Sequence, residues 1–317
     1  MVHILDFEEP VFNLEQKINE LTHLSKGGQV NLTDEIKRLK KKAHRMQTDI
    51  FSRLTSWQKT QIARHPNRPN TLDYIKHMTG DFIELHGDRC FADGHSVVGG
   101  PAKFEGRPIM IIGHQKGRGT KEKVFRNFGM SQPEGYRKAL RLMKMAEKFN
   151  LPIITLLDTP GAYPGIEAEE RGQAEAIAQN IKAMSNLSVA VIVVVIGEGG
   201  SGGALALGVG NRILMLKYSI YSVISPEGCA AILWNDPKKL EDAANALLLN
   251  SEDLLKLKAI DEIVKEPHGG AHRNHNYMVS ILRRVIRRHL NELNKMSPKE
   301  LIKERHEKFQ NMGSFIE

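Results

Sequence analysis

Cysteine is scarce in this chain, and the scarcity argues against two kinds of structure. Cys90 and Cys229 are the only cysteines among the 317 residues, and the sequence contains no CxxC pair. Disulfide-stabilised domains and structural zinc sites need several cysteines at short spacings. We therefore expect neither a disulfide framework nor a metal site in this chain.

Long apolar runs are absent as well. The longest, VAVIVVVI at 189–196, has eight residues, whereas a helix that spans a membrane needs about 20. The first residues, MVHILDFEEPVF, contain no basic segment followed by an apolar one, so they do not resemble a secretion signal. With 41% hydrophobic and 26% charged residues, the composition is that of a globular protein. We expect a cytoplasmic protein.

A GxxxxGK[ST] loop, which holds nucleotide phosphates in GTPases, is also missing. The segment DTPG at 158–161 follows an apolar run and imitates a GTPase switch motif. A GTPase needs that loop to hold the phosphates of its nucleotide, so its absence excludes a GTPase.

Positive charge, by contrast, is in excess. The formal net charge of +8 favours anionic partners such as phosphates, coenzyme A, nucleic acid or an acidic subunit. Two basic runs, 37–45 and 283–288, lie on predicted helices, where we interpret them as solvated faces. A third cluster follows the predicted strand 109–113 and is interspersed with glycines, which favours a ligand-binding loop. Its cations are Lys116, Arg118, Lys121, Lys123 and Arg126.

The most informative stretch is VAVIVVVIGEGGSGGALALGVG at 189–210. Its first eight residues are apolar and mostly β-branched, which predicts a strand buried on both faces. Five glycines follow within residues 197–203, and ALAL at 204–207 then favours a helix. A glycine turn between a buried strand and a helix directs free N–H groups into one small volume, where the helix dipole favours an anion. This geometry suits a developing oxyanion or a phosphate.

Three other interpretations of the glycine turn stay open. Gly197-x-Gly199-x-x-Gly202 matches a dinucleotide fingerprint, although the acidic residue expected about 20 positions later is missing. Gly199-x-Ser201-x-Gly203 matches the nucleophile elbow of a serine hydrolase. That elbow would take its acid and its histidine from the downstream candidates Asp236, Asp261, His268 and His272. The third alternative is a purely structural turn, and we favour an oxyanion site without a protein nucleophile.

A second loop, PGAYPG at 160–165, follows the predicted strand 152–157. Its prolines fix φ and its glycines permit tight turns, so we expect a rigid loop. The glycine turn, by contrast, presents a backbone almost without side chains. We expect this loop to wall the pocket opposite the glycine turn; a plain connection between a strand and a helix is the alternative. Its residues are Gly161, Ala162, Tyr163, Pro164 and Gly165.

The chain before residue 80 has a helical pattern. Apolar residues recur at steps of three and four in 7–21 and in 36–50, and SKGG at 25–28 predicts a turn between the two helices. The narrow apolar seam of such a hairpin must be buried, and we expect a partner subunit to contact it. We therefore divide the chain into a helical extension, 1–80, and a main domain, 81–317, which ends in helices.

The main domain alternates strands with helices, which predicts an α/β fold. SVVGGPAKF and RPIMIIGH flank Glu105-Gly106 and form a predicted β-hairpin. SQPE at 131–134 combines a capping box with a proline at the first helical position, so we expect a helix to about residue 149. A helix at 167–186 and a strand at 212–225 complete the prediction.

Six segments together resemble one family, the carboxyltransferase alpha subunits of bacterial acetyl-coenzyme A carboxylase. They are GHQKGRGTKEK (113–123), NFGMSQPEGYRKALRLM (127–143), PIITLLDTPGAYPG (152–165), EERGQAEAIA (169–178), IGEGGSGGALALGVG (196–210) and YSVISPEGCAAILW (221–234). Each is weak alone, but six in this order are specific. The resemblance covers nearly the whole chain. It implies a crotonase-type fold, a spiral of ββα units, in an α2β2 complex whose beta subunit carries a zinc ribbon.

The resemblance also implies a reaction and its partners. A carboxyl group would pass from carboxybiotin, held on a biotin carboxyl carrier protein, to acetyl-CoA and give malonyl-CoA for fatty acid biosynthesis. ATP would be consumed at a separate biotin carboxylase subunit. Gly202, Gly203 and Ala204 match the family's turn of N–H donors for the biotin ureido oxygen, and the beta subunit would serve the enolate.

Two binding questions stay open at this stage. The cationic loop from Lys116 to Arg126 is expected to bind either coenzyme A phosphates or a carboxylate. The remaining basic surface permits RNA binding, but no module that interleaves aromatic and basic residues makes nucleic acid the main ligand.

Overall fold

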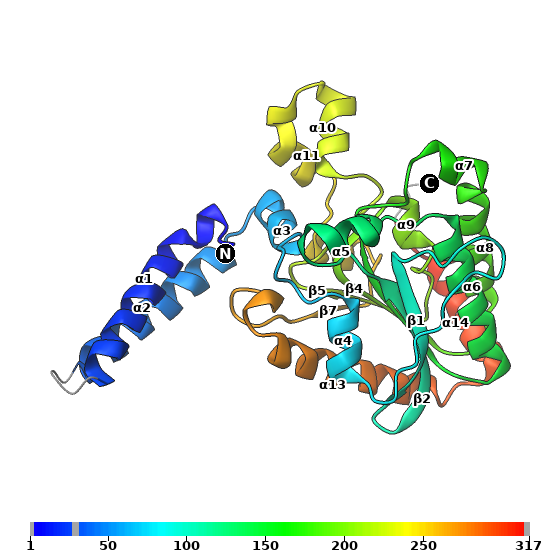
Figure 1. Ribbon diagram of the computed structural model, residues 1–317, viewed down its shortest axis with the longest axis horizontal. Coiled ribbons are helices and arrows are strands. Elements are labelled where there is room, and N and C mark those ends of the chain that lie inside the picture. Colours follow the sequence, from blue (N-terminus) through cyan, green and yellow to red (C-terminus); the bar gives the residue numbers. More distant parts are fainter. Residues whose placement is uncertain (1–2, 27–31, 314–317) are drawn as a thin grey trace.

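The computed structural model describes residues 3–26 and 32–313, which form a long helical hairpin and an α/β body (Figure 1). The first part comprises η1 (Asp6–Glu8), α1 (Glu9–Lys26), α2 (Thr33–Ser52), α3 (Ser56–Ala63) and α4 (Thr71–Met78). In Figure 1, α1 and α2 extend away from the body, whereas α4 lies against the sheet. No helix of the described residues is long and apolar enough to cross a membrane.

One sheet organises the body. Its strands are β1 (Val97–Phe104), β2 (Arg107–His114), β3 (Ile153–Thr159), β4 (Val191–Gly200), β5 (Arg212–Leu216), β6 (Ile220–Ser222) and β7 (Glu262–Val264). Their order is β1-β2-β3-β4-β5-β7, and β6 pairs with β4. Only β1 and β2 pair in the antiparallel sense; from β2 onward neighbouring strands are parallel, so their carboxyl ends meet at one edge.

Helices occupy the connections between strands. Between β2 and β5 these are α5 (Gly119–Phe125), η2 (Asn127–Gly129), α6 (Pro133–Lys148), α7 (Ile166–Glu170), α8 (Gln173–Asn186) and α9 (Ser201–Leu205). Later in the chain come α10 (Pro226–Trp234), η3 (Pro237–Lys239), α11 (Leu240–Ala246), α12 (Ser251–Lys256), η4 (Ala271–Arg273), α13 (His275–Leu293) and α14 (Pro298–Gln310). Helices therefore alternate with strands, as the sequence predicts.

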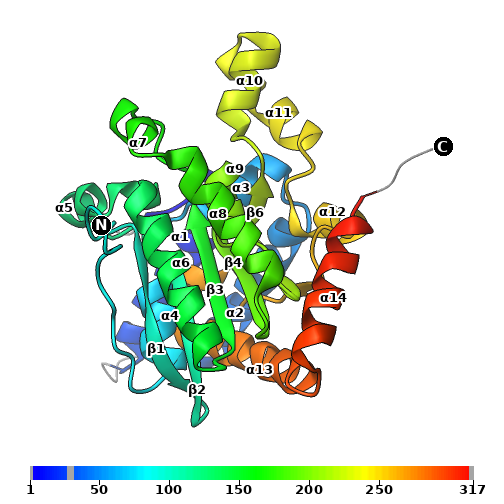
Figure 2. The same cartoon turned by 90° about the vertical axis from the view of Figure 1, so that its right-hand side faces the viewer.

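Both faces of the sheet are buried, which explains the apolar run in β4. On this strand Ile192 and Val194 pack in a layer with α4 and α13, while Val193 and Val195 pack in the opposite layer with α6 and α8 (Figure 2). All four side chains are fully buried. β-Branched residues suit such a strand because their stiff side chains pack well on a pleated surface.

The predicted β-hairpin is confirmed. Phe104 pairs with Arg107, so the turn has two residues, Glu105 and Gly106. Both adopt positive φ, 49° and 81°, as a type I′ turn requires. The predicted helix after residue 131 is also present, although it begins at Pro133 with Gln132 as its N-cap.

Three sequence predictions are wrong in detail. The strand expected at 212–225 is two strands, because the chain turns after Leu216 and β6 then pairs with the end of β4. The helix expected at 167–186 is interrupted at Gly172, which adopts a φ of 80° and separates α7 from α8. The glycines at 197–200 are strand, not loop, since β6 supplies pairing partners for Glu198, Gly199 and Gly200.

The amino-terminal hairpin buries its own seam. Ile18 of α1 packs against Leu39 and Ala43 of α2. Phe51, at the end of α2, joins a small cluster with Tyr218 that attaches the hairpin to the body. The predicted turn at 25–28 lies partly outside the described residues. The expected contact of the hairpin with a partner subunit stays a prediction.

Candidate active site at the carboxyl edge of the sheet

The two loops singled out in the sequence lie side by side at the carboxyl edge of the sheet. β3 leads into the loop 160–165, and its neighbour β4 leads into α9, with Thr159 paired to Gly199 at the end of the strands. Ligands of open parallel sheets bind at this edge, where the connections leave the strands. Adjacent strands therefore bring the two predicted loops together.

The glycine turn is shorter than the sequence suggests and ends in a short helix. α9 begins at Ser201, with Gly200 as its N-cap. The N–H groups in the first turn of a helix have no partner within that helix. Ser201, with a φ of 53°, Gly202 and Gly203 lie in this turn. Gly202, Gly203 and Ala204 therefore stay the predicted donors to a ligand.

Gly203 packs directly against the second loop. A Cβ atom at this position would lie 2.6 Å from the Ala162 nitrogen and 2.6 Å from the Gly161 carbonyl carbon. Its φ lies outside the left-handed region, so close approach, not backbone conformation, requires glycine here. At Gly202 the atom nearest to an added Cβ would be Ile177 Cδ1 at 3.6 Å, an ordinary contact that leaves room for a small side chain at this position.

The loop 160–165 is held by its own hydrogen bonds. The Thr159 hydroxyl donates to the Gly161 carbonyl at 2.8 Å and accepts from the Gly161 N–H at 3.1 Å. The Tyr163 N–H donates to the Ser131 carbonyl at 3.0 Å, and Gln173 Nε2 donates to the Tyr163 carbonyl at 2.8 Å. Gly161 is buried; Ala162, Tyr163 and Gly165 are half-buried, and Pro164 is exposed. These bonds hold the loop in place beside the glycine turn, and its role as a wall of the ligand pocket stays a prediction.

A group of charges around two buried carboxylates, Asp158 and Glu198, lies where β2, β3 and β4 end. Lys116 Nζ is 2.8 Å from Asp158 Oδ1 and 2.5 Å from Glu198 Oε2. Arg64 contacts the other oxygen of Glu198 at 2.6 Å and pairs with Glu227 of α10 at 2.5 Å. Burial alone would raise the pKa of Glu198, but Lys116 and Arg64 outweigh it and lower the pKa to about 2. The Lys116 charge is thus used within the protein.

The other predicted cations have different surroundings. Arg118 forms a two-bond ion pair with Asp73, and Arg126 donates to the His95 carbonyl at 2.8 Å. Lys121 and Lys123, on α5, form no hydrogen bond or ion pair with any described residue. Arg126 has no carboxylate partner among the described residues either, so its charge, like those of Lys121 and Lys123, is not neutralised by an ion pair, and only the two lysines have no hydrogen-bond partner.

The sequence analysis did not identify Arg64, Glu227 or Glu198 as parts of the site. The sequence does contain a signal for Glu198 and Asp158. Each is an acidic residue at the end of a predicted buried strand, a position typical of functional residues. Arg64 and Glu227 are 163 positions apart, and nothing local indicates that they pair.

The serine hydrolase and dinucleotide interpretations both fail. Ser201 is exposed, and its hydroxyl has no hydrogen-bond partner among the described residues. The candidate acid Asp261 is paired with Lys308, while the rings of His268 and His272 pack on His44 and His65. The dinucleotide fingerprint needs a glycine turn after the strand, but its first two glycines lie within β4.

One cluster outside this edge has metal-binding residue types. Ligand atoms of Glu8, His65 and His272 lie within 4.8 Å of one another. However, His65 Nδ1 accepts the Asn67 N–H at 3.2 Å, and Nε2 faces the His3 carbonyl at 3.2 Å. The rings of His65 and His272 are stacked with centroids 3.9 Å apart, so their in-plane lone pairs do not converge. The cluster fits an attachment of the amino-terminal segment better than a metal site.

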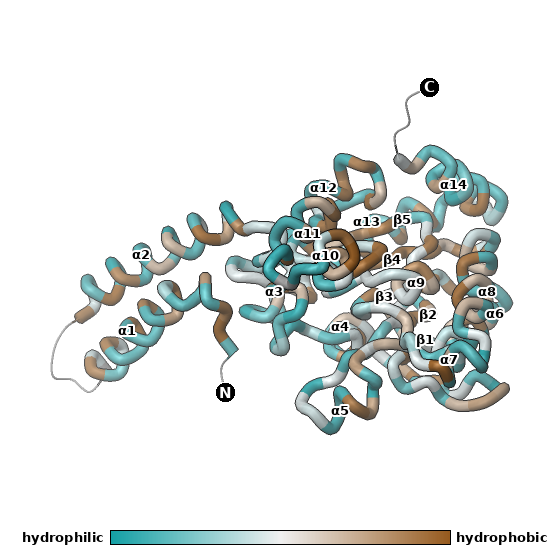
Figure 3. Tube along the Cα trace, turned by 90° about the horizontal axis from the view of Figure 1, so that it is seen from above, coloured by the Kyte–Doolittle hydropathy of each residue, from teal (hydrophilic) through white to brown (hydrophobic). Residues whose placement is uncertain are grey.

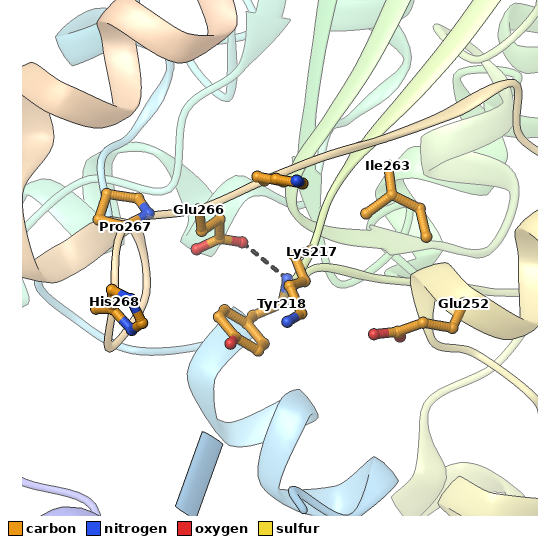
Figure 4. Close-up of a pocket in the computed structure, with 8 residues that line it drawn as sticks. Lys217, Tyr218, Glu252, Ile263, Glu266, Pro267 and His268 are labelled. Carbon is orange, nitrogen blue, oxygen red and sulfur yellow. Dashed lines mark hydrogen bonds between the residues drawn. The ribbon is translucent and has the colours of Figure 1, made fainter. Parts of the chain in front are cut away.

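A separate pocket of about 350 Å³ opens beyond the ends of β5 and β7 (Figure 4). Glu266 lines it and accepts the Tyr218 N–H at 2.8 Å. The carboxylate of Glu266 is also held by both Nη atoms of the buried Arg68. Of the candidates named from the sequence, only His268, a histidine considered for the serine hydrolase, lines this pocket. No residue of the glycine turn, the loop 160–165 or the cationic loop does, so we place the candidate site at the glycine turn.

Comparison with known proteins shows similarity along nearly the whole chain. Residues 4–313 match the family model described as acetyl co-enzyme A carboxylase carboxyltransferase-like. The acetyl-coenzyme A carboxylase carboxyl transferase subunit alpha of Geobacter metallireducens is 61% identical over 313 residues, which cover 99% of this chain and 98% of that protein.

Solved structures share the fold at low sequence identity. Transcarboxylase 12S superposes with a TM-score of 0.59 at 21% identity, over 74% of this chain and 44% of that chain. A malonate decarboxylase hetero-tetramer of Pseudomonas, in complex with coenzyme A, has a TM-score of 0.56 at 15% identity, over 67% of this chain and 85% of that chain. These matches confirm the expected crotonase-type α/β fold.

A first prediction is that Ser201 is not an activated nucleophile. A fluorophosphonate probe should not label Ser201, because no described histidine activates its hydroxyl and an unactivated serine is a weak nucleophile. Mass spectrometry of the probe-treated protein, beside a serine hydrolase treated in parallel, makes the measurement. A covalent adduct on Ser201 would show that the elbow is functional.

A second prediction tests the role of Lys116. The Lys116→Met variant should lose about 3 kcal/mol of unfolding free energy, because the buried carboxylates of Asp158 and Glu198 would lose the cation that both contact. Lys121→Met, which changes an exposed and unpaired lysine nearby, should change it by no more than about 0.5 kcal/mol. Urea unfolding followed by circular dichroism compares the two. Equal stability of the two variants would contradict a structural role for Lys116.

Proposed function

This chain belongs to the family of acetyl-CoA carboxylase carboxyltransferase alpha subunits, and from that premise we propose that its glycine turn serves the biotin side of the carboxyl transfer. In the proposed reaction a carboxyl group passes from carboxybiotin on a carrier protein to acetyl-CoA and gives malonyl-CoA. The product would enter fatty acid biosynthesis. The observation that carries this proposal is the pair of free N–H groups at Gly202 and Gly203, which lies beside a rigid loop.

The chemistry explains why free N–H donors are sufficient on this side. When CO2 leaves N1 of biotin, negative charge develops on the ureido oxygen, and that anion can take the methyl proton of acetyl-CoA. The enolate so formed then attacks CO2. The chain's task is to hold the ureido oxygen, and each well-placed donor contributes about 2.7 to 4 kcal/mol in other enzymes. The space beside Gly202, where only Ile177 approaches, fits this task.

Two free lysines support binding of an anionic substrate group nearby. Lys121 and Lys123 lie on α5, which follows the end of β2. Both coenzyme A phosphates and a substrate carboxylate remain candidate ligands for them. The loop 160–165 would line the same pocket, with the half-buried Tyr163 as its aromatic residue.

A partner subunit is needed because the reaction generates two anions and this chain supplies one oxyanion-type turn. We propose a beta subunit with a zinc ribbon, in an α2β2 assembly that works in the cytoplasm with a biotin carboxyl carrier protein and a biotin carboxylase. Figure 3 colours much of α10 brown, for hydrophobic residues, and we take this helix as a candidate protein contact. Ile232 and Leu233 are 74% and 64% exposed, and exposed apolar patches of this kind mark interaction sites.

The helix α10 is also connected to the site. Glu227, in its first turn, pairs with Arg64, which in turn contacts Glu198 at the end of β4. A subunit seated on α10 would therefore lie close to the glycine turn. The amino-terminal hairpin stays a second candidate contact, and the division at residue 80 stays part of this proposal.

A third prediction follows from the shared active site. The purified chain alone should show no biotin-dependent decarboxylation of malonyl-CoA, because the enolate would lack its own donors. Addition of the zinc-ribbon partner should restore the reaction. Coupled spectrophotometric assays of each subunit and of the mixture provide the measurement, and robust activity of this chain by itself would contradict the proposal.

A fourth prediction separates the roles of the two glycines. Gly202→Ala should lower kcat at least tenfold with an unchanged thermal midpoint, because its Cβ meets no protein atom closely but occupies the ligand's space. Gly203→Ala should lower both kcat and the thermal midpoint, since its Cβ would displace the backbone of the loop 160–165.

The measurement is steady-state kinetics of the assembled complex beside thermal unfolding. Gly80→Ala, where no atom lies within 4 Å of the added Cβ, is the control for a harmless glycine substitution. A Gly202→Ala complex with normal kcat would show that the ureido oxygen does not approach this residue.

A further inference from the structure

The side chain of Gln173 joins two connections of the sheet beside the glycine turn. Gln173 is the first residue of α8. Its amide nitrogen, Nε2, donates to the Ser131 carbonyl and to the Tyr163 carbonyl, each at 2.8 Å. Ser131 lies in the segment that leads into α6, and Tyr163 belongs to the loop 160–165. One amide group therefore ties this loop to the body of the protein.

The two acceptors fix which way the amide group points. A glutamine amide has two N–H donors on its nitrogen, whereas its oxygen can only accept. Both donors of Gln173 are used, while its Oε1 is buried and has no partner among the described residues. With the amide reversed, Oε1 would face two carbonyl oxygens and no donor. The N–H groups are therefore the part of this side chain that its surroundings require.

The loop 160–165 is held on both sides of the point where it meets the glycine turn. Before that point, the Thr159 hydroxyl bonds to both backbone groups of Gly161. After it, Gln173 bonds to the Tyr163 carbonyl. Between these two anchors lies the peptide that follows Gly161, and the Gly203 backbone packs against it. Because each peptide unit is planar and stiff, release of the second anchor would let this peptide move away from Gly203.

The start of α8 is itself fixed, so Gln173 projects from a defined place. Gly172, the N-cap of α8, adopts a φ of 80°, a conformation that glycine favours. The Arg171 side chain contacts the buried Glu134 carboxylate of α6 at 3.2 Å, and the Arg171 carbonyl accepts a hydrogen bond from Arg137 at 3.0 Å. These bonds attach the joint between α7 and α8 to α6.

We infer that Gln173 is a positioning residue of the carboxyl-transfer site: its amide N–H groups hold the loop 160–165 against the first turn of α9. The inference rests on the proposed function. Gln173 acts through the loop, which bounds the glycine turn and keeps its free N–H groups in place relative to the ligand. Loss of the amide donors should therefore impair the chemical step.

The kinetic test uses Gln173→Met in the assembled complex, with biotin-dependent decarboxylation of malonyl-CoA as the reaction. Methionine has a similar length and no donor. We expect kcat to fall about 10- to 100-fold, because small misplacements of a catalytic turn have effects of this size. The KM for malonyl-CoA should stay within about twofold. Gln173→Glu, which keeps the shape and polarity but has an oxygen in place of the donating nitrogen, should show the same loss and replaces the methionine variant if that one fails to assemble.

Hydrogen exchange tests the structural step without the reaction. In the full chain, the amides of the loop 160–165 should exchange at least about fivefold faster in Gln173→Met, the size expected for the loss of one hydrogen bond. The Tyr163 N–H, which donates to the Ser131 carbonyl at 3.0 Å, is the amide to follow. Mass spectrometry of peptides that cover the loop makes the measurement.

Two controls separate positioning from general loosening of the fold. Gln179→Met makes the same substitution on the exposed surface of α8, where Gln179 Nε2 donates to Glu175 at 2.6 Å, and should change neither kcat nor the exchange of the loop. Ser251→Ala removes the bond from the buried Ser251 to the Lys217 carbonyl at 2.8 Å, away from the site. It should lower the thermal midpoint and keep kcat within about twofold.

Three results would overturn the inference. They are unchanged exchange of the loop in the donor-free variants, faster exchange with a normal kcat, and a loss of kcat that Ser251→Ala reproduces. Failure of the proposed function is recognised separately. The unchanged complex would then show no decarboxylation, while the exchange measurement would still report whether Gln173 holds the loop.

Discussion

The approach of two backbones, at Gly203 and at Gly161 to Ala162, is the constraint on which the site depends. It exists because β3 and β4 are parallel neighbours, so the segments that leave them emerge side by side. At Gly200, too, a Cβ would lie 2.1 Å from the Pro160 carbonyl oxygen. With no side chains between them, the loop 160–165 holds α9 in place, and the free N–H groups of its first turn point in defined directions.

Most of the charged side chains at this edge of the sheet pair with one another and so stabilise the fold. Lys116 lies between two carboxylates, and Arg64 extends the group to Glu227 on α10. Removal of one member would leave an uncompensated buried charge, which is costly. The Glu198 pKa of about 2 is below its unfolded value of 4.5, so the stabilisation it contributes is fully present above about pH 4.5 and is lost as pH falls toward 2. These ion pairs hold the ends of β2, β3 and β4 together and leave the glycine turn uncharged, which suits a site for a developing anion.

Several features of the site follow from local chemistry, and the sequence predicts them. β-Branched residues indicated the buried strand, glycine and proline indicated the two loops, and Glu105-Gly106 indicated the hairpin turn. The local sequence pattern predicts secondary structure less reliably where pairing with a distant strand decides it. The glycines at 197–200 have loop composition but form strand, because β6 returns to pair with them.

The sequence by itself determined the α/β class, the two loops of the site and the family to which the chain belongs, because these depend on residue types at short spacings. Only the tertiary structure decided what Lys116 binds, since Asp158 and Glu198 are 40 positions apart and meet through parallel pairing. It also decided that Arg64 pairs with both Glu198 and Glu227. Each of these outcomes depends on which strand or helix lies next to a residue, and the spacing of residues along the chain does not reveal which element that is.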